Sequence, residues 1–264
     1  MLRTSRPLRA AILWSHGCPG VAELLADPAR GRTWDLVCAV SSEEQPAQGD
    51  LALFRSADIR VVCLPIRPFY RLHGRALSDL SLRRNYDEQV AARLFPFHPD
   101  LLLLSSYIYV ATPVLLGATR NGVVNIHGSD LTRKGSDGRP QYLGLRAVAD
   151  AIFAGEPETR ATAHWVTEEV DMGPPILRSR AFPVSPLVPA ALARDDRKAV
   201  KAYAYAHQEW MLHEAWGSLW KQVIRRVAAG HAVPERARWP AQGTDARSDL
   251  DDRVRPIAAA EPGA

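Results

Sequence analysis

Residues 100–105 read Asp100-Leu101-Leu102-Leu103-Leu104-Ser105, the most apolar short run in the chain. A run of strand length without polar alternation predicts a β-strand that is buried on both faces, as in the middle of a parallel sheet. Ser106–Ala111 continues past the end of this strand, and Thr112-Pro113 then opens a short helix, with threonine as cap and proline at the first helical position. The order strand, connection, helix indicates a layered α/β architecture.

The same order recurs on both sides of this strand. Apolar runs predict strands at Leu8–Trp14, Trp34–Val40, Ile59–Leu64 and Gly122–His127. Helical patterns lie between them or after them, at Val21–Ala26, Asp50–Ser56, Asn85–Leu94 and Leu145–Ala154. We therefore expect an α/β fold with a doubly wound, mostly parallel, Rossmann-like sheet. In such sheets ligands bind beyond the carboxyl ends of the strands.

Other segments carry weaker patterns. Pro65–Arg84 is rich in Arg, Pro and aromatic residues and is interpreted as a loop, and the long polar stretch 128–144 as a functional loop. Two further strands are expected at Thr159–Val166 and Ile176–Val184, and a long helix at Ala199–Ala229, whose apolar stripe should pack back on the domain.

These patterns suggest three regions. Residues 1–185 would form the catalytic domain, and residues 186–230, after the prolines near 183–189, a C-terminal helical extension that packs on it. The Arg-, Asp-, Ala- and Pro-rich residues 231–264 would form a tail that is partly disordered.

Composition excludes several functional classes. The 264 residues are 47% hydrophobic and 23% charged, as in a soluble globular protein. A net charge of +4 without a Lys/Arg run interleaved with aromatics favours a solvated basic surface over a nucleic-acid groove. No apolar stretch approaches the 18 residues that a membrane span needs, and no signal peptide is expected.

Three scattered cysteines, Cys18, Cys38 and Cys63, argue against a disulfide framework or a zinc site and suit a reducing cytoplasm. The first turn, Ser15–Gly20, lacks the G-x-G-x-x-G fingerprint of dinucleotide binding. We expect a cytoplasmic protein with neither metal nor nicotinamide, and we leave a homodimer open.

The candidate chemistry lies at the end of the strand Gly122–His127. Asn125 can donate to an oxyanion, His127 can act as an imidazolium donor or as a base, and Asp171 could raise the imidazole pKa and pass a proton through water. A Gly-x-Ser-x-Gly elbow and a suitably placed Cys-His pair are both missing. The nucleophile should therefore come from a substrate, as in direct transfer from an activated donor to an amine.

Four motifs in order give this chemistry a family context. They are Asn125-Ile126-His127, Tyr142-Leu143-Gly144-Leu145, Thr162-Ala163-His164-Trp165-Val166 and Val170-Asp171-Met172-Gly173-Pro174-Pro175-Ile176-Leu177. This pattern resembles the folate-dependent formyltransferase family, most of all its phosphoribosylglycinamide formyltransferases, and methionyl-tRNA formyltransferases share the catalytic domain. The resemblance spans residues 8 to 225 and is specific mainly over 100 to 180.

The resemblance implies a one-carbon transferase that uses 10-formyltetrahydrofolate. Asn125 and His127 would stabilise the oxyanion, while Asp171 would orient and charge His127. The pterin would meet two segments. Its contacts would come from Tyr107, Ile108, Tyr109 and Ala111 after the central strand, and from Thr167, Glu168 and Val170 before Asp171.

Departures from the family pattern fall where the acceptor should sit. The glycinamide enzymes hold a substrate phosphate with Gly-Ser-Asn in the first turn, which here reads Ser15-His16-Gly17-Cys18-Pro19-Gly20. The segment after Asn-x-His begins Gly128-Ser129-Asp130 instead of Pro-Ser-Leu and is longer. The expected acceptor contacts are therefore His16, Gly17, Cys18, Gly128, Ser129 and Asp130. The acceptor would be a small-molecule primary amine, such as an amino sugar or a hydroxylated ornithine.

Alternatives remain open. The chain could formylate glycinamide ribonucleotide itself, or it could be a non-catalytic folate-binding relative. We do not expect a tRNA formyltransferase, whose C-terminal β-barrel pattern is missing, or a formyl-folate hydrolase, whose N-terminal domain would find no room before Leu8. Cys18, Tyr107 and Tyr109 could equally be packing residues, and His164 is interpreted as a core residue. Arg133, Lys134 and Arg139 are interpreted as a solvated loop rather than an anion site.

Overall fold

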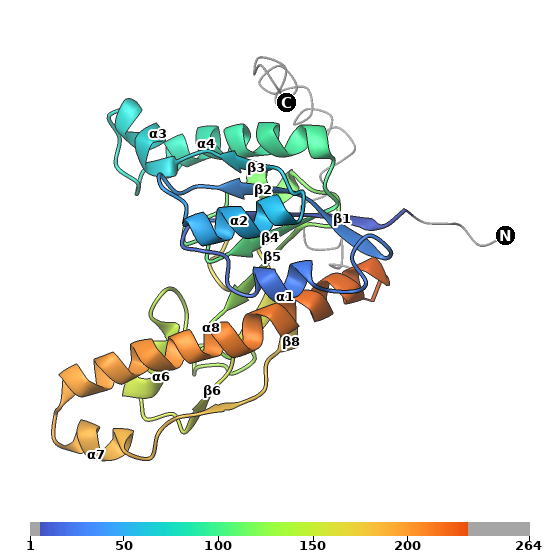
Figure 1. Cartoon of the computed structure of the whole chain (residues 1–264). Coiled ribbons are helices and arrows are strands. Elements are labelled where there is room, and N and C mark those ends of the chain that lie inside the picture. The colour runs from blue at the N-terminus through green and yellow to red at the C-terminus, as the bar shows by residue number, and fades with distance from the viewer. Residues whose placement is uncertain (1–5, 232–264) are drawn as a thin grey trace. The chain divides into compact units, whose positions relative to one another are not determined.

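The computed structural model describes residues 6–231. Strands and helices alternate along most of its length, as the apolar runs predict (Figure 1). The first half contains these elements: β1 (Leu8–Trp14), α1 (Val21–Leu25), β2 (Trp34–Ser41), α2 (Gln48–Ser56), β3 (Val61–Cys63), α3 (Ile66–Leu72), α4 (Leu80–Leu94), a 3-10 turn at Phe95–Phe97, β4 (Leu101–Ser105) and α5 (Pro113–Gly117).

The second half begins with β5 (Val123–His127), the strand that carries the candidate site. It continues with α6 (Ala147–Phe153), β6 (Glu158–Thr159), β7 (Thr162–Trp165), β8 (Pro175–Arg178), β9 (Phe182–Pro183), α7 (Val188–Ala193) and α8 (Arg197–Ala228).

The described residues form a mostly parallel, seven-stranded sheet with the strand order β3-β2-β1-β4-β5-β7-β8. β1 pairs in parallel with both β2 and β4, so that Trp14 lies opposite Ser41 on one side and Ser105 on the other. β8 pairs antiparallel with β7. All five residues of β4 are buried. The predicted fold class is confirmed. The leucine run forms an interior strand, because its apolar side chains can be buried on both faces of the sheet.

The expected loop at Pro65–Arg84 is wrong. This segment contains α3 and the first turn of α4, which begins at Leu80 rather than at Asn85. The cap is Asp79, whose Oδ1 accepts hydrogen bonds from the Ser81 amide at 3.0 Å and the Ser81 hydroxyl at 2.6 Å. The sequence does not show where α4 begins, because Arg83, Tyr86 and Asp87 interrupt the apolar residues on the buried face of its first half.

The two strands expected after α6 are each broken. Thr159–Val166 divides into β6 and β7, and Ile176–Val184 divides into β8 and β9. β6 and β9 pair with each other in a separate antiparallel ribbon, with Thr159 opposite Phe182. An apolar pattern predicts extended chain but does not say which strand is its partner.

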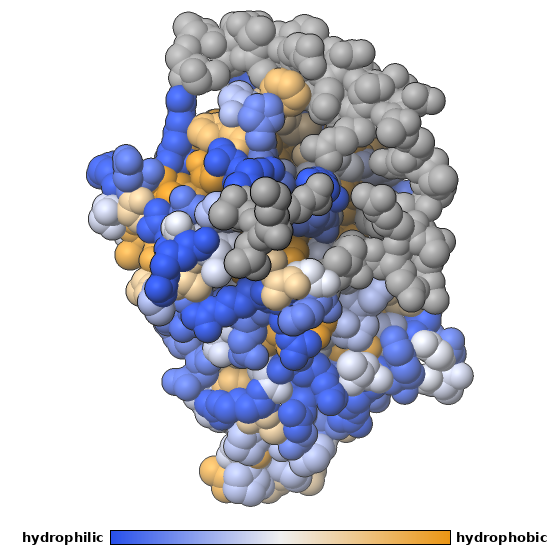
Figure 2. All heavy atoms as spheres, turned by 90° about the vertical axis from the view of Figure 1, so that its right-hand side faces the viewer, coloured by the Kyte–Doolittle hydropathy of each residue, from blue (hydrophilic) through white to orange (hydrophobic). Residues whose placement is uncertain are grey.

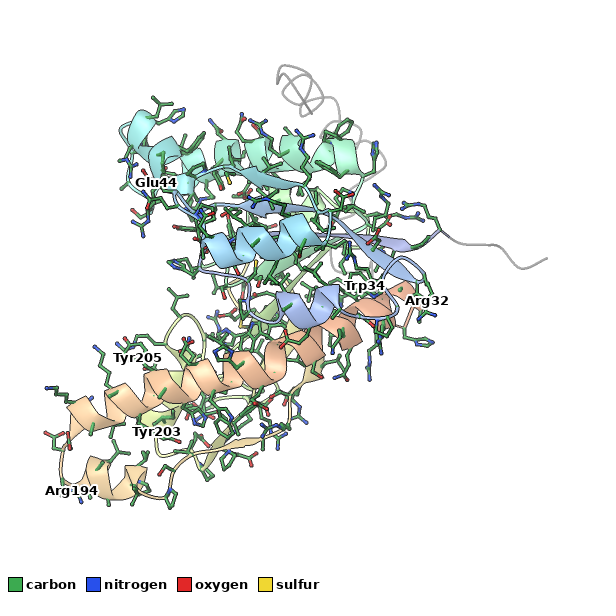
Figure 3. All side chains as sticks on the ribbon, in the orientation of Figure 1. Arg32, Trp34, Glu44, Arg194, Tyr203 and Tyr205 are labelled. Carbon is green, nitrogen blue, oxygen red and sulfur yellow. The ribbon has the colours of Figure 1, made fainter. Side chains whose placement is uncertain are left out.

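The long helix α8 has the predicted apolar stripe. Trp216, Leu219, Trp220 and Val223 are buried on it. Tyr203 and Tyr205 project from different sides of the helix (Figure 3), and Tyr205 is exposed. The Tyr203 hydroxyl accepts from the Ser185 amide at 2.8 Å and so fastens the segment before α7. α7 itself, within the proline-rich stretch, was not expected.

By its contacts the chain divides into two compact units that do not follow the sequence order. Among the described residues, one unit contains residues 6–18, Leu25–Val124 and residues 224–231, and the other contains Pro19–Leu24 and Asn125–Val223. The predicted regions 1–185 and 186–230 stay predictions, and the tail 231–264 lies outside the described residues. On the face in Figure 2, hydrophilic and hydrophobic residues are interspersed. Within the described chain, no helix combines the length and apolar character needed to cross a membrane.

Candidate active site

Asn125, His127 and Asp171 come together within one of the two units. Asn125 and His127 are on β5, two residues apart, so that both side chains lie on the same face of the sheet. Asp171 lies in the connection between β7 and β8. The His127 Nδ1 atom is 3.3 Å from Asp171 Oδ2, and both side chains are more than 90% buried. The convergence that the motifs predict is therefore present for the histidine and the aspartate.

Asp171 is held by more than the histidine. Its Oδ2 also accepts the Gly144 amide at 2.8 Å, from the end of the 128–144 loop. Asp171 has a φ of 55°, in the left-handed region that Asp tolerates better than most residues. Gly173 is required nearby, since a Cβ there would lie 1.6 Å from the Trp165 carbonyl oxygen. The Asp-x-Gly motif thus lets the chain bend tightly against β7 and present the carboxylate.

Both ring nitrogens of His127 face acceptors. Nδ1 faces Asp171, and Nε2 lies 3.2 Å from the Tyr142 carbonyl oxygen. Burial lowers the pKa of His127 from its usual value, while the Asp171 carboxylate and the Tyr142 carbonyl act in the opposite direction. A neutral ring can donate to one of these acceptors, whereas the imidazolium donates to both. Protonation of His127 would therefore add a second hydrogen bond, while burial opposes the charge.

His164 is buried, as expected, but it is also part of this cluster. Its Nδ1 donates to the Trp165 carbonyl oxygen at 2.9 Å. Its Nε2 lies 3.5 Å from Asn125 Nδ2 and 3.7 Å from Asp171 Oδ1. Burial lowers the pKa of His164 to about 4, against the Asp171 charge. His164 is therefore neutral and can accept one amide hydrogen of Asn125, leaving the second for a ligand.

Sequence reasoning did not assign a role to His164. The residue sits within the quoted Thr162–Val166 motif, but on β7 a buried histidine reads as core. The contact between His164 and Asn125 follows from the strand order, which places β7 next to β5. No local sequence pattern predicts that strand pairing.

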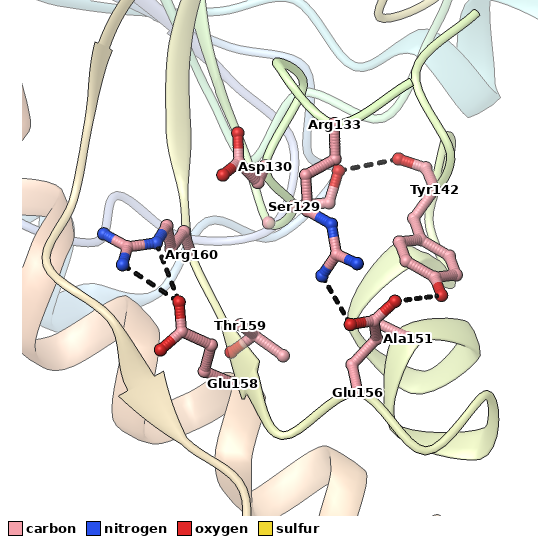
Figure 4. A pocket seen from close by; sticks show the side chains of 10 residues that line it. Ser129, Asp130, Arg133, Tyr142, Ala151, Glu156, Glu158, Thr159 and Arg160 are labelled. Carbon is pink, nitrogen blue, oxygen red and sulfur yellow. Dashed lines mark hydrogen bonds and ion pairs between the residues drawn. The ribbon is translucent and has the colours of Figure 1, made fainter. Parts of the chain in front are cut away.

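The beginning of the 128–144 loop bonds to its end. The Ser129 hydroxyl donates to the Tyr142 carbonyl at 2.6 Å, and Thr162 Oγ1 donates to the Ser129 carbonyl at 2.7 Å. A cavity of about 30 Å³ lies against Gly128, Ser129, Arg133, Tyr142 and Glu156 among others (Figure 4). Such a cavity holds about two water molecules.

The predicted acceptor contacts in this loop are engaged within the protein. Asp130 accepts from the Thr132 amide at 3.0 Å and from Arg178 at 2.8 Å. Gly128 packs tightly, since a Cβ there would lie 2.9 Å from Val148. Gly128, Ser129 and Asp130 thus shape the loop, and their contact with an acceptor stays a prediction.

Two carboxylates from other segments, Glu43 and Asp50, bond to amides of the first turn. The Gly17 amide donates to Glu43 Oε1 at 2.8 Å, and the Cys18 amide donates to Asp50. Burial and the neighbouring Glu43 raise the pKa of Asp50. Cys18 is buried and His16 is exposed. The Gly17 and Cys18 amides, which could otherwise bind an anion, are therefore occupied.

The predicted pterin segment is ordered by buried groups in the same unit. The Ile108 amide donates to Ser15 Oγ at 3.0 Å, and that hydroxyl donates to the Ser106 carbonyl at 2.7 Å. Tyr107 is buried and lies edge-on to Tyr109, with ring centres 5.5 Å apart. Arg83, which is buried, lies 5.0 Å from the centre of the Tyr109 ring. Tyr107, Ile108, Tyr109 and Ala111 remain predicted folate contacts.

The second predicted pterin segment precedes Asp171. Thr167 donates to the Glu169 carbonyl at 3.1 Å, while Glu168 and Val170 are exposed. Val170 is exposed next to the buried Asp171, and contact between Thr167, Glu168 or Val170 and folate stays a prediction. Among residues 6–231 there is no group of three or more His, Cys, Asp or Glu side chains that could hold a metal ion.

Comparison with known proteins gives the family. A sequence model described as formyl transferase matches residues 8–188, more than half of the chain. The chain belongs to the formyl transferase family. The resemblance inferred from the four motifs is thereby confirmed.

Individual formyl transferases are more distant. The trifunctional purine biosynthetic protein adenosine-3 of Drosophila melanogaster is 27% identical over 219 residues, which cover 82% of this chain and 14% of that protein. A methionyl-tRNA formyltransferase from Aromatoleum aromaticum is 26% identical over 242 residues, 91% of this chain and 64% of the relative. The chain thus spans less than two thirds of these curated relatives.

Solved structures share the fold. Glycinamide ribonucleotide transformylase 1 from Symbiobacterium toebii superposes with a TM-score of 0.64 and 23% identity, covering 89% of this chain and 94% of that one. At this identity the likeness supports the fold and leaves the acceptor open.

Proposed function

We propose that this protein transfers the formyl group of 10-formyltetrahydrofolate to a primary amine of a small-molecule acceptor. The observation that carries the proposal is the buried His127–Asp171 pair, with Asn125 on the same strand face. Family membership supplies the donor class. The second class of function, a non-catalytic folate-binding relative, gives no reason for a buried imidazole to face a carboxylate.

In this mechanism the acceptor amine attacks the formyl carbon, and the carbonyl oxygen becomes an oxyanion. The Asn125 amide and the protonated His127 would donate hydrogen bonds to that oxygen. Asp171 would stabilise the imidazolium. Collapse of the intermediate breaks the bond between the formyl carbon and the folate nitrogen, and the proton lost by the amine is passed to that nitrogen, giving tetrahydrofolate and the formamide.

The test measures amine-dependent release of tetrahydrofolate from the formyl donor. We expect wild-type turnover with at least one amine of a chemically varied panel. His127→Ala and Asn125→Ala should each reduce the rate about 100- to 1000-fold, as loss of an oxyanion donor does. A wild-type protein that binds the donor but releases none of it with any amine would overturn the proposal.

We also propose that the acceptor carries no phosphate, unlike glycinamide ribonucleotide. The support is the first turn, where Glu43 and Asp50 occupy the Gly17 and Cys18 amides. Pro19 has no amide hydrogen to offer. Two carboxylates next to a phosphate would repel it. Phosphate-free amines such as an amino sugar or a hydroxylated ornithine fit this environment.

Competition between acceptors tests this second proposal. Phosphate-free amines should be formylated with the higher kcat/KM, and Glu43→Gln should improve the relative use of glycinamide ribonucleotide. Arg32→Gln is the control, because Arg32 is exposed and its side chain donates to the Pro28 carbonyl, a contact away from the Gly17 and Cys18 amides. Efficient turnover of glycinamide ribonucleotide alone would establish the purine-pathway alternative instead.

A further inference from the structure

Tyr142 connects His127 to a second buried carboxylate. Its carbonyl oxygen faces His127 Nε2 at 3.2 Å, and its hydroxyl donates to Glu156 Oε1 at 2.9 Å. The same glutamate accepts Arg133 through Oε2 (Figure 4). Tyr142 therefore contacts His127 through its main-chain carbonyl and Glu156 through its side-chain hydroxyl.

Glu156 is a firm anchor for these contacts. It follows α6, where Gly155 has a φ of 79° and the Glu156 amide donates to the Ala151 carbonyl at 3.1 Å. This backbone closes the end of the helix and fixes the direction of the chain. The Glu156 side chain is 11% exposed, and its bond from the Tyr142 hydroxyl is partly buried, whereas its partner Arg133 is 47% exposed.

Glu156 adds to other contacts that hold this loop near His127, and it bonds to the Tyr142 side chain. Tyr142 is held at its carbonyl by Ser129, and Gly144 is held by Asp171. Without Glu156 the phenol ring would lose its polar partner on the helix side, and only Gln141 would bond to its hydroxyl, at 3.0 Å. The Tyr142 backbone could then move relative to the imidazole.

We propose that Glu156 is a positioning residue that, through Tyr142, keeps a carbonyl oxygen on His127 Nε2 and so favours the protonated form of the histidine. With Nδ1 donating to Asp171, a neutral ring points its Nε2 lone pair at the carbonyl, which is unfavourable. A proton on Nε2 turns that contact into a hydrogen bond. In the proposed reaction the Nε2 proton would be shared between the Tyr142 carbonyl and the oxyanion, so this inference rests on the proposed function.

The titratable and charged groups around His127 come from three elements. Asp171 faces Nδ1, His164 lies on the far side of Asp171, and Tyr142 faces Nε2. Burial lowers the pKa of His164 to about 4, so His164 is mostly neutral above about pH 5, and the His127 midpoint is compared in that range. A change in the His127 titration after substitution of Glu156 would therefore report on the Tyr142 contact.

The first experiment follows the His127 imidazole by nitrogen-15 NMR over pH 4–9 in the full chain, without any substrate. In Glu156→Ala the titration midpoint of His127 should fall by roughly half a unit or more, because a hydrogen bond to the charged form is lost. Glu156→Gln should restore most of the shift, since its amide oxygen can still accept the Tyr142 hydroxyl. This readout does not depend on formyl transfer.

The second experiment measures kcat against pH with the formyl donor and the best amine. Glu156→Ala should reduce kcat about tenfold at neutral pH with little change in KM. The ratio to wild type should recover at lower pH, where His127 is protonated in both proteins. Glu158→Ala is the matched control, because Glu158 lies two residues away and pairs with Arg160 (Figure 4).

An unchanged His127 midpoint in a folded Glu156→Ala variant would overturn the inference, and so would an equal shift in Glu158→Ala. A shifted midpoint in a protein that transfers no formyl group would support the positioning contact while the proposed function fails. The two proposals are thus separable.

Discussion

At the scale of single residues, the candidate site depends on side chains whose protonation is fixed by burial. His164 is neutral and accepts from Asn125, while His127 faces acceptors on both nitrogens. In the proposed mechanism the two buried imidazoles have different roles: His164 orients the Asn125 amide, and His127 gains and loses a proton. The neighbouring glycine allows the backbone to carry Asp171 into contact with both.

We expect His164→Phe to lower kcat about tenfold with little effect on KM, because the Asn125 amide loses the acceptor that orients it. Steady-state kinetics of single and double variants check this. Combined with Asn125→Ala, the His164 substitution should add almost nothing. Additive losses would mean that His164 acts independently of Asn125. The pH–rate profile should show no group that titrates as His164 between pH 5 and 8.

We expect Gly173→Ala to be strongly destabilising, by about 3 kcal/mol or more, because its Cβ would collide with the Trp165 carbonyl oxygen. Denaturant unfolding provides the measurement. Gly49→Ala is the control, since Gly49 lies in α2 with open space around its Cβ. That variant should gain up to about 1 kcal/mol. Equal effects at the two positions would contradict the packing argument.

At the scale of elements, α4 shows why polar residues can form a core face. Asp87 is buried and accepts the Thr112 amide at 2.8 Å and the Thr112 hydroxyl at 2.7 Å, so α4 fixes the start of α5. Burial raises the pKa of Asp87 to about 6, although the Thr112 bonds and Arg83 oppose the rise. Arg83 in turn bonds to the Val110 carbonyl at 3.3 Å. Through Arg83 and Asp87, α4 thus bonds to the chain at and just after the predicted pterin segment.

The raised pKa of Asp87 predicts a pH-dependent stability. The folded-state pKa, about 6, exceeds the unfolded value of roughly 3.9, so the folded protein binds the proton more tightly. The stabilisation is fully present below about pH 4 and is lost as the pH rises through 6. Unfolding free energies of wild type and Asp87→Asn should diverge between pH 4 and 8, by up to about 3 kcal/mol in favour of the variant. Parallel curves would show that Asp87 has an ordinary pKa in the folded state.

At the scale of the whole molecule, the two compact units are interleaved in sequence. β5 belongs to both, because the division falls between Val124 and Asn125. The catalytic candidates lie in one unit, and the first turn and the Tyr107–Ala111 segment lie in the other.

Removal of metal ions should leave the whole enzyme active. The proposed chemistry uses an amide, an imidazole and a carboxylate. The described residues include no group of three or more His, Cys, Asp or Glu side chains that could hold a metal ion. Dialysis against EDTA should therefore leave the rate of tetrahydrofolate release unchanged within error. A loss of activity that zinc or magnesium restores would contradict this mechanism.

The sequence by itself determined the α/β class, the positions of most strands and the family. These features are written in contiguous residues: apolar runs of strand length such as Leu101–Leu104, and motifs such as Asn125–His127 and Asp171–Gly173. The sequence did not predict α3 or the start of α4. In α4 the buried residues Arg83, Tyr86 and Asp87 interrupt the apolar pattern.

Only the tertiary structure decided which distant groups meet. His164 contacts Asn125, Glu156 holds Tyr142, and Glu43 caps the Gly17 amide, and none of these pairs has a local signature. The physical reason is that hydrogen bonds and ion pairs depend on distances of a few ångströms, which sheet pairing and loop closure set after the elements have formed. The sequence indicated the group that is transferred, and the folded chain indicated which groups hold the histidine and occupy the first turn.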